Sequence, residues 1–154
     1  DSGGRGVFKT TDAGNTWVKF DYPGQYVTSL AISPTDPNLI FAGANDGIYL
    51  SDDGAASWTQ LNQYRGLAVM ALAFDAEGNL YASTEEFGLA KSSDLGKTWE
   101  SINRPPDNLT ATSIAVDSQN KILYAAGHAA PQGYQEVFKG DLDGSYWQLV
   151  GTNK

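Results

Sequence analysis

A short motif that recurs four times, and ends on tryptophan each time, constrains this chain more than any other feature. The pattern [Ser/Thr]-x-Asp-x-Gly-x-[Ser/Thr]-Trp is complete at residues 10–17 and 92–99. Residues 51–58 follow it with alanine in the glycine position, and residues 140–147 form a looser copy. The four tryptophans, at positions 17, 58, 99 and 147, lie 41, 41 and 48 residues apart. The chain is therefore a series of repeated units, each of about 40–45 residues.

The residue types of the motif predict a rigid corner between two strands. Short hydroxyl and carboxylate side chains hydrogen-bond to nearby backbone N–H groups and hold a tight turn. Glycine permits a positive φ, and tryptophan packs a large apolar surface onto the adjoining sheet. This chemistry favours a structural role over a catalytic or metal-binding role for the aspartates. The residues assigned to the structural role are Thr10, Asp12, Gly14, Thr16, Trp17, Ser51, Asp53, Ser57, Trp58, Ser92, Asp94, Gly96, Thr98, Trp99 and Trp147.

The motif resembles the Asp-box, or BNR repeat, found in sialidases, xyloglucanases, sortilin-type receptors and photosystem II assembly factors. The resemblance runs from Gly6 to Val150 and implies an all-β fold, a β-propeller of four-stranded antiparallel blades. Residues 33–43 look much like blades of xyloglucanase-type proteins. In these families the boxes lie on the face opposite the ligand site, and they specify architecture without specifying activity.

Each repeat divides into four predicted strands. The innermost strands are expected at residues 29–33, 71–75 and 113–117, and the second strands at 39–43, 80–83 and 122–126. The third strands are expected at 6–9, 47–50, 88–91 and 136–139, and a fourth begins at each tryptophan. The resulting units are residues 1–20, the outer half of a blade, followed by three blades at 27–61, 68–102 and 111–150.

About three and a half blades do not close a ring, because a propeller needs about 4–8 of them. Sheet faces left open at the two ends would expose apolar residues that normally meet a partner. We therefore expect the ring to be completed by the rest of a longer polypeptide of six to eight blades. The alternative is an assembly in which other subunits complete the ring.

Composition excludes several classes of partner and site. The net charge of −8 and the pI near 4.4 argue against nucleic acid and against an anionic membrane surface. The chain has no cysteine, which excludes disulfides and thiolate zinc sites, and no apolar run long enough to span a bilayer. We expect no cofactor or metal. The chain opens on Asp1 without a methionine, which suggests a mature product or an interior piece, located in the secreted, periplasmic or cell-surface space.

The ligand face is expected where the loops that follow second and fourth strands meet. The ligand-binding candidates in these loops are Tyr26, Asn45, Tyr64, Arg65, Arg104, His128 and Tyr134. Tyrosines there can stack on sugar rings or anchor a loop, and the second role is favoured. His128, the single histidine, is assigned to a loop without a metal. Asp141–Gly144 loosely resembles a calcium loop, but it lacks the later glutamate and falls on the repeated turn.

Two function classes follow. The first is a non-catalytic binding or scaffold domain for a protein or glycan, which fits a sequence without a complete catalytic constellation. The alternative is a glycoside hydrolase, for which Asp46 with Glu85 or Glu86 would be the weak candidates for acid and base or nucleophile. The xyloglucanase-like type is favoured over the sialidase-like type, because none of the three arginines stands in the Phe-Arg-Ile-Pro stretch of sialidases. The charge of −8 argues against an assembly factor of the photosystem II type, which carries a basic patch.

Overall fold

The computed structural model describes residues 6–24, 26–106, 109–129 and 133–153, and their strands pair into four antiparallel sheets. The first sheet pairs β1 (Val7–Lys9) with β2 (Val18–Phe20). The second contains β3 (Val27–Ile32), β4 (Ile40–Ala44), β5 (Gly47–Ser51) and β6 (Thr59–Gln60). The third contains β7 (Val69–Phe74), β8 (Leu80–Thr84), β9 (Gly88–Ser92) and β10 (Glu100–Ile102). The fourth contains β11 (Thr110–Asp117), β12 (Ile122–Ala129), β13 (Tyr134–Asp141) and β14 (Trp147–Thr152).

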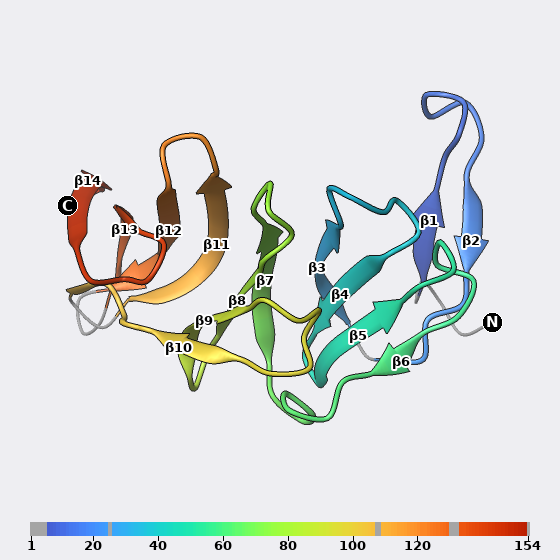
Figure 1. The fold of residues 1–154 in the computed structure, drawn as a ribbon, viewed down its shortest axis with the longest axis horizontal. Helices are drawn as coiled ribbons and strands as arrows, with labels where there is room; N and C mark the ends of the chain where they lie inside the picture. Colours follow the sequence, from blue (N-terminus) through green and yellow to red (C-terminus); the bar gives the residue numbers. More distant parts are fainter. Residues whose placement is uncertain (1–5, 25, 107–108, 130–132, 154) are drawn as a thin grey trace.

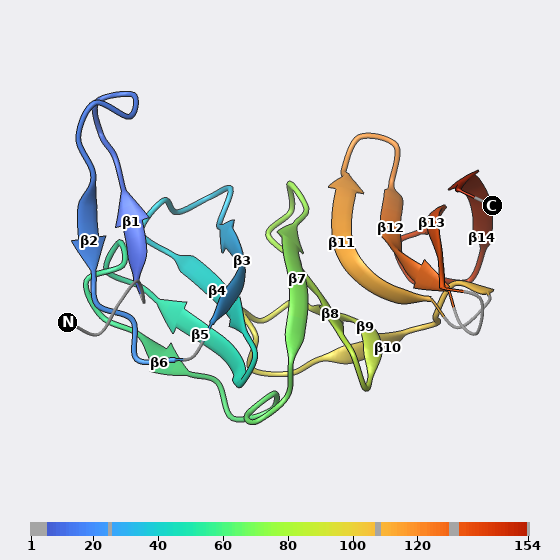
Figure 2. The same ribbon diagram turned by 180° about the vertical axis from the view of Figure 1, so that it is seen from behind.

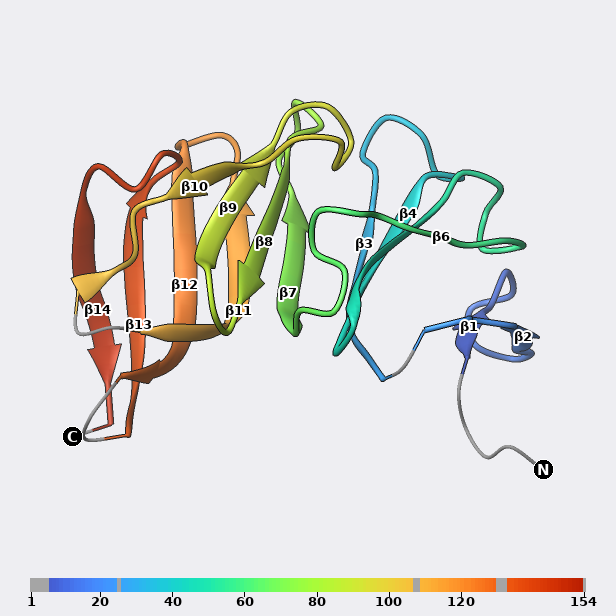
Figure 3. The same ribbon diagram turned by 90° about the horizontal axis from the view of Figure 1, so that it is seen from below.

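The sheets stand side by side in the order of the chain, and the two termini lie at opposite ends of the row (Figure 1). Within each four-stranded sheet, consecutive strands are neighbours, so the chain runs outward from the innermost strand. The innermost strands β3, β7 and β11 lie next to one another and point the same way (Figure 2). Seen from below, the two-stranded sheet stands at one end beside the three complete sheets (Figure 3). The predicted all-β architecture, three four-stranded sheets and a half sheet, is confirmed.

The innermost strands share a β-bulge at the same place. The register shifts between Val27 and Ser29 in β3, between Val69 and Ala71 in β7, and between Ala111 and Ser113 in β11. A bulge adds one residue to a strand and increases its local twist. The repeated bulge gives the three inner strands a common shape, which lets them pack side by side.

Hydrogen bonds between side chains and backbone join neighbouring inner strands. The Thr28 hydroxyl donates to the carbonyl of Gly43 at 3.0 Å within its own sheet and to that of Val69 at 2.5 Å in the next. The Ser29 hydroxyl accepts the N–H of Leu72 at 3.0 Å. Two of these bonds tie the bulge of β3 to the backbone of β7 in the next sheet.

Apolar side chains fill the space between consecutive sheets. Phe41 and Leu80 are fully buried between the second and third sheets, and Phe41 meets Phe74 edge-on at 5.6 Å. Tyr81 and Leu123 occupy the corresponding layer between the third and fourth sheets. Strands β4 and β8 are buried along their whole length, as expected for strands covered on both faces.

The repeated turns follow one hydrogen-bonding scheme. In the third turn the Ser92 hydroxyl donates to Asp94 at 2.8 Å and accepts the N–H of Gly96 at 2.8 Å. The Asp94 carboxylate also accepts the N–H of Thr98 at 2.8 Å and its hydroxyl at 2.6 Å. The turns at residues 10–17 and 51–58 repeat every one of these bonds. In the looser turn at 140–147 a different residue, Asp141, accepts the hydroxyl of Ser145 and the N–H of Tyr146.

The glycine position of the turn is left-handed even where the residue is not glycine. Gly14 and Gly96 have φ values of +89° and +80°, and Ala55 adopts +83° in the same place. The residue before this position is also left-handed in all three turns, and in the second turn it is Gly54. A glycine displaced by one position therefore still provides one of the two left-handed residues.

Two sequence expectations about the tryptophans need correction. The fourth strand begins one residue after the tryptophan in the first three repeats, because the tryptophan itself completes the turn, and only β14 begins on Trp147. Trp58 and Trp99 are half-buried, as predicted, but Trp17 is 60% exposed. Trp17 differs because, within the described residues, no sheet precedes β1 and none covers its ring.

Candidate functional site

The predicted ligand face is the end of the sheets that carries the β4–β5 turn, the β8–β9 turn and the connections between sheets. In antiparallel sheets of consecutive strands, alternate connections lie at the same end. The β6–β7 connection and the β8–β9 turn lie along the lower edge of the molecule in Figure 1. These two loops therefore lie at one end of the molecule.

The weak catalytic candidates occupy different environments. The Asp46 carboxylate accepts the hydroxyl of Tyr49 at 2.9 Å, and the Asp46 carbonyl accepts the N–H of Gly66 at 2.7 Å and the amide of Gln60 at 2.8 Å. Burial, together with this bond to the carboxylate, raises the pKa of Tyr49 to about 12. Glu85 and Glu86 are exposed on the β8–β9 turn. Asp46 thus fastens the β6–β7 connection to the second sheet.

The remaining candidates are spread over the face. Tyr26 is 65% exposed just before β3, and its carbonyl accepts the N–H of Asn45 at 3.2 Å. Arg65 is exposed on the β6–β7 connection, and Tyr134 opens β13. The assignment of His128 to a loop is wrong, because β12 and β13 pair over eight residues each and include it in β12.

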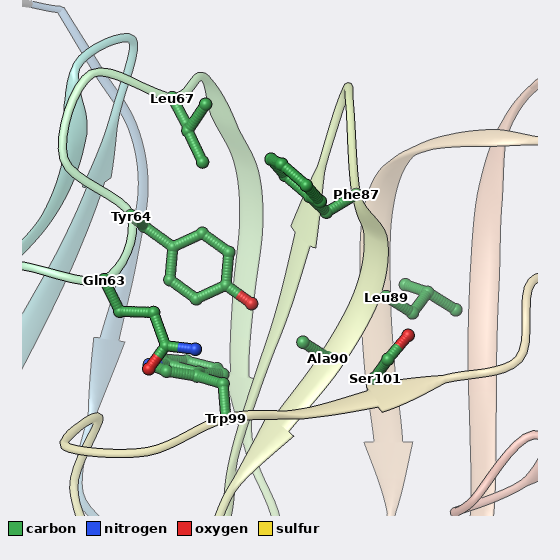
Figure 4. A pocket seen from close by; sticks show the side chains of 8 residues that line it. All are labelled: Gln63, Tyr64, Leu67, Phe87, Leu89, Ala90, Trp99 and Ser101. Carbon is green, nitrogen blue, oxygen red and sulfur yellow. The ribbon is translucent and has the colours of Figure 1, made fainter.

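A pocket of about 250 Å³ opens between the β6–β7 connection and the third sheet (Figure 4). Its lining residues are Gln63, Tyr64, Leu67, Phe87, Leu89, Ala90, Trp99 and Ser101. Of the sequence candidates, only Tyr64 is among them. The Tyr64 ring points into the pocket and meets Trp99 edge-on, with ring centroids 5.1 Å apart.

Burial divides the pocket into a floor and a rim. Tyr64 and Ala90 are buried in the same core layer and form the floor, whereas the Leu89 side chain belongs to the layer on the other face of the third sheet. Gln63, Phe87 and Ser101 are exposed and form the rim. The exposed residues stand around the pocket, which is therefore open to solvent.

The pocket exists because one strand position carries a small residue. Ala90 pairs with Ala82 of the neighbouring inner strand, as Tyr49 pairs with Ala42 and Phe138 with Ala125. The second and fourth sheets therefore fill this place with an aromatic ring, whereas the third sheet leaves it empty. The contrast between Ala90 and its two counterparts was visible in the sequence once the repeats were aligned.

An added residue brings Phe87 to the rim. The β4–β5 turn has two residues between Ala44 and Gly47, whereas the β8–β9 turn has three between Thr84 and Gly88. The extra residue of the longer turn explains why Phe87, a large apolar side chain, is 59% exposed. Sequence reasoning missed Phe87, although the difference in turn length was its signal.

The turn that carries Phe87 is held from two sides. Inside, the buried Thr84 hydroxyl accepts the N–H of Phe87 at 3.0 Å. Outside, the guanidinium of Arg104 donates to the carbonyl of Glu86 at 2.5 Å. The Arg104 side chain lies against Gly88, where an added Cβ would come within 2.4 Å of its Nε. Arg104, a predicted ligand contact, thus supports the turn beside the pocket.

This pocket differs from a second cavity in the charge of the residues that line it. None of the eight residues that line the first pocket is charged, although the chain carries a net charge of −8. The second cavity, of about 340 Å³ between the third and fourth sheets, is lined by charged residues that include Lys91, Glu100 and Asp141. The first pocket therefore suits a neutral ligand.

The described residues contain no cluster of three or more histidine, cysteine, aspartate or glutamate side chains arranged to hold a metal ion. Within the same residues, no helix is long and apolar enough to cross a membrane.

Comparison with known proteins gives two curated relatives. The chain is 25% identical over 162 aligned residues to an oligoxyloglucan-reducing end-specific xyloglucanase of Emericella nidulans, which covers 97% of the chain and 20% of the relative. It is 26% identical over 144 residues to a protein of Neosartorya fischeri named "Probable oligoxyloglucan-reducing end-specific xyloglucanase", covering 79% and 17%. The chain thus spans about a fifth of the length of these relatives. No family model matches it.

Solved structures show the same fold. The GH74 enzyme of Niastella koreensis aligns with a TM-score of 0.75 and 21% identity, over 94% of this chain and 25% of the enzyme. YCF48 bound to a D1 peptide aligns with a TM-score of 0.68 and 18% identity, over 94% of this chain and 46% of that chain. The four sheets are therefore blades of a β-propeller, and the curated relatives of the chain are xyloglucanases.

Proposed function

We propose that this chain is the carbohydrate-binding section of the propeller of a xyloglucanase-type glycoside hydrolase. The observation that carries the proposal is the similarity to a xyloglucanase along 97% of the chain. The neutral, aromatic-lined pocket on the candidate ligand face supports it, because small-molecule sites combine apolar and aromatic side chains with a few polar groups.

The section contributes binding, and the acid and base of hydrolysis lie elsewhere in the whole protein. The Asp46 carboxylate accepts a hydrogen bond from the Tyr49 hydroxyl. Neither Asp46 nor Glu85 or Glu86 lines the pocket. A glycosidase needs two carboxyl groups about 5–10 Å apart across the scissile bond. In the full-length protein, Asp46→Asn and Glu85→Gln should therefore leave the hydrolysis rate within about twofold of wild type.

The decisive test measures binding and hydrolysis of a xylose-branched cello-oligosaccharide by the full-length protein. Binding with sugar release supports the xyloglucanase type, and binding without release supports the non-catalytic alternative, a glycan-binding domain. Loss of release in Asp46→Asn or Glu85→Gln, with binding retained, would place the chemistry within this section. No binding of any glycan would overturn the proposal.

We further infer that the repeated turns are Asp-boxes and that other blades cover the terminal sheets. Phe8 and Val18 of the first sheet are 50% and 58% exposed, and Leu149 and Val150 of the last sheet are 39% and 47% exposed. Apolar surface of this kind normally meets a partner. The partner is the rest of the same polypeptide or, alternatively, another subunit, and the mass of the native protein by light scattering distinguishes the two. The expected location is secreted, periplasmic or cell-surface.

A further inference from the structure

We propose that β1 and the exposed side of β3 bind a β-hairpin of the same polypeptide, which supplies two inner strands to the first sheet. The hairpin pairs with the open edge of β1 and covers Leu30 and Ile32. The inference rests on the proposal that the rest of the polypeptide completes the propeller, and it does not depend on the ligand.

The inner edge of β1 is open among the residues that the structure describes. The third strands β5, β9 and β13 each lie between a second and a fourth strand. β1 is their counterpart, because Phe8 pairs with the residue two places after Trp17, as Tyr49 does with the residue two places after Trp58. Among the described strands β1 pairs only with β2, and its other side faces β3 (Figure 2, Figure 3). Such an edge presents backbone groups that a further strand can bind.

Leu30 and Ile32 show which side of β3 lacks a cover. Leu30 is 47% exposed, whereas its counterparts Leu72 and Ile114, which also pair with alanine, are 6% and 9% exposed. Ile32 is 58% exposed and lies on the same side of the strand. Ala31, between them, points the other way and is buried in the layer shared with the third sheet. The exposed side of β3 therefore faces the first sheet.

The contacts between complete sheets define the polar contact of the hairpin. The Thr28 hydroxyl of the second sheet donates to the carbonyl of Val69 in the third at 2.5 Å. The Ser83 hydroxyl of the third sheet donates to the carbonyl of Ala111 in the fourth at 2.8 Å. Both carbonyls belong to the residue before the bulge, and Val27 occupies this position in β3. The hairpin therefore presents a serine or threonine hydroxyl to the Val27 carbonyl.

The same comparison defines the apolar contact. Phe41 of β4 shares a core layer with Leu72, and Tyr81 of β8 shares one with Ile114. Both aromatic residues belong to the second strand of the preceding sheet and are fully buried. The second strand of the hairpin therefore carries an aromatic ring against Leu30, and this is the strand that pairs with β1.

Cysteine labelling of the full-length protein tests the inference, because this chain contains no cysteine of its own. Single cysteines replace Leu30, its buried counterpart Leu72 and the exposed Asp52, and mass spectrometry follows the reaction of each peptide with a maleimide. Leu30→Cys should react at least about tenfold more slowly than Asp52→Cys, since a covered thiol reacts only when the structure opens locally. Its rate should match that of Leu72→Cys. A rate equal to that of Asp52→Cys would overturn the hairpin.

Hydrogen exchange of the unmodified full-length protein gives a second test without any substitution. Peptides that contain β1 should exchange as slowly as peptides that contain β9, because both edges of each strand are then paired. Exchange of β1 that is clearly faster than that of β9 would contradict pairing with the hairpin.

A cysteine at Phe8 separates this inference from the proposed closure of the propeller. Phe8, next to the buried Val7, lies on the side of the first sheet that faces away from the second sheet. A protected Phe8→Cys with a reactive Leu30→Cys would overturn the hairpin and leave the covering blade intact. Reactive cysteines at both positions would overturn both. Protection of Leu30→Cys that disappears on dilution would assign the strands to another subunit and overturn the origin proposed here.

Discussion

Tyr64 meets Trp99 edge-on, with ring centroids 5.1 Å apart and ring planes at 86°. One repeat earlier, Tyr22 meets Trp58 in the same way, at 5.5 Å and 84°. Each tyrosine lies on the connection that leaves one sheet, and each tryptophan ends the repeated turn of the next. The repeated turns therefore join neighbouring sheets in addition to reversing the chain.

Removal of the Tyr64 ring should destabilise the folded protein. Tyr64 is 6% exposed, and large-to-small changes of buried aromatic residues cost about 3–5 kcal/mol. Tyr64→Ala should lower the free energy of unfolding by about 3 kcal/mol in urea titrations. Tyr26→Ala, at an exposed tyrosine, should change it by less than about 0.5 kcal/mol. Equal effects of the two variants would contradict the packing role of Tyr64.

Two glycines of the repeated turns separate backbone strain from packing. A Cβ added at Gly14 would have no atom within 4 Å. Gly14→Ala should therefore lower the free energy of unfolding only through its left-handed backbone, by about 1–2 kcal/mol. Gly96→Ala has nearly the same φ, but its Cβ would lie 2.6 Å from Leu61 Cδ1. Overpacking should add about 1–3 kcal/mol, measurable as a lower urea midpoint. Identical midpoints would show that Leu61 moves aside freely.

The turn aspartates should make stability depend on acidic pH. Hydrogen bonds from the following threonine or serine lower the pKa of Asp12, Asp53 and Asp94 to about 2. An unfolded aspartate has a pKa of about 3.9, so the folded state binds fewer protons between these values. The stabilisation is thus complete above pH of about 4 and is lost as pH falls toward about 2.

Urea midpoints between pH 6 and pH 2 test this dependence. Asp53→Asn should lower the urea midpoint at pH 6. Between pH 6 and pH 2 the midpoint of this variant should also decrease less than that of the wild type, because one titrating group is gone. Asp52→Asn, in the variable position of the same turn, is the matched control and should keep the wild-type profile. A wild-type profile in Asp53→Asn would disprove the contribution of that turn.

The hydroxyl of Thr28 should stabilise the contact between the second and third sheets. It donates to Gly43 and Val69, and Thr28→Val leaves both carbonyls without this donor. Both bonds are only partly buried, and a hydrogen bond of this kind contributes about 0.5–1.5 kcal/mol, so Thr28→Val should lower the free energy of unfolding by about 1 kcal/mol. Thr112→Val, at the same bulge position of β11, loses only a 3.5 Å contact within its own sheet and should have a smaller effect. A larger effect at Thr112 would contradict the role of Thr28 between sheets.

The fold could be predicted because its determinants are local and periodic. The tryptophan spacing set the repeat, and alternating apolar runs located every strand to within a few residues. The lengths of β12 and β13 were underestimated, because hairpin pairing as far as Ala129 and Tyr134 depends on a partner strand and not on local residue preference. The exposure of Trp17 likewise depends on neighbouring sheets.

The candidate site was predicted less well than the fold. The sequence placed the loops at one end, and Tyr64 was selected for its type and position. Phe87 and Ala90 escaped notice because neither has a reactive group. Both stand out only when equivalent positions of the repeats are compared. Phe87 lies in a turn with one residue more than its counterpart, and Ala90 replaces an aromatic residue. Conversely, Asp46 has the chemistry of a catalytic residue, but its carboxylate is bonded to Tyr49.

The common bulge of β3, β7 and β11 fixes the register in which each inner strand pairs with its neighbour. A shift of one residue in a strand would turn every side chain to the opposite face. If a single residue beside a bulge were deleted, the strand could not restore its pairing by shifting its register. The inner strands therefore do not tolerate changes in length. Such changes are confined to the turns, and the segment from Thr84 to Gly88 is where this chain has already accommodated one.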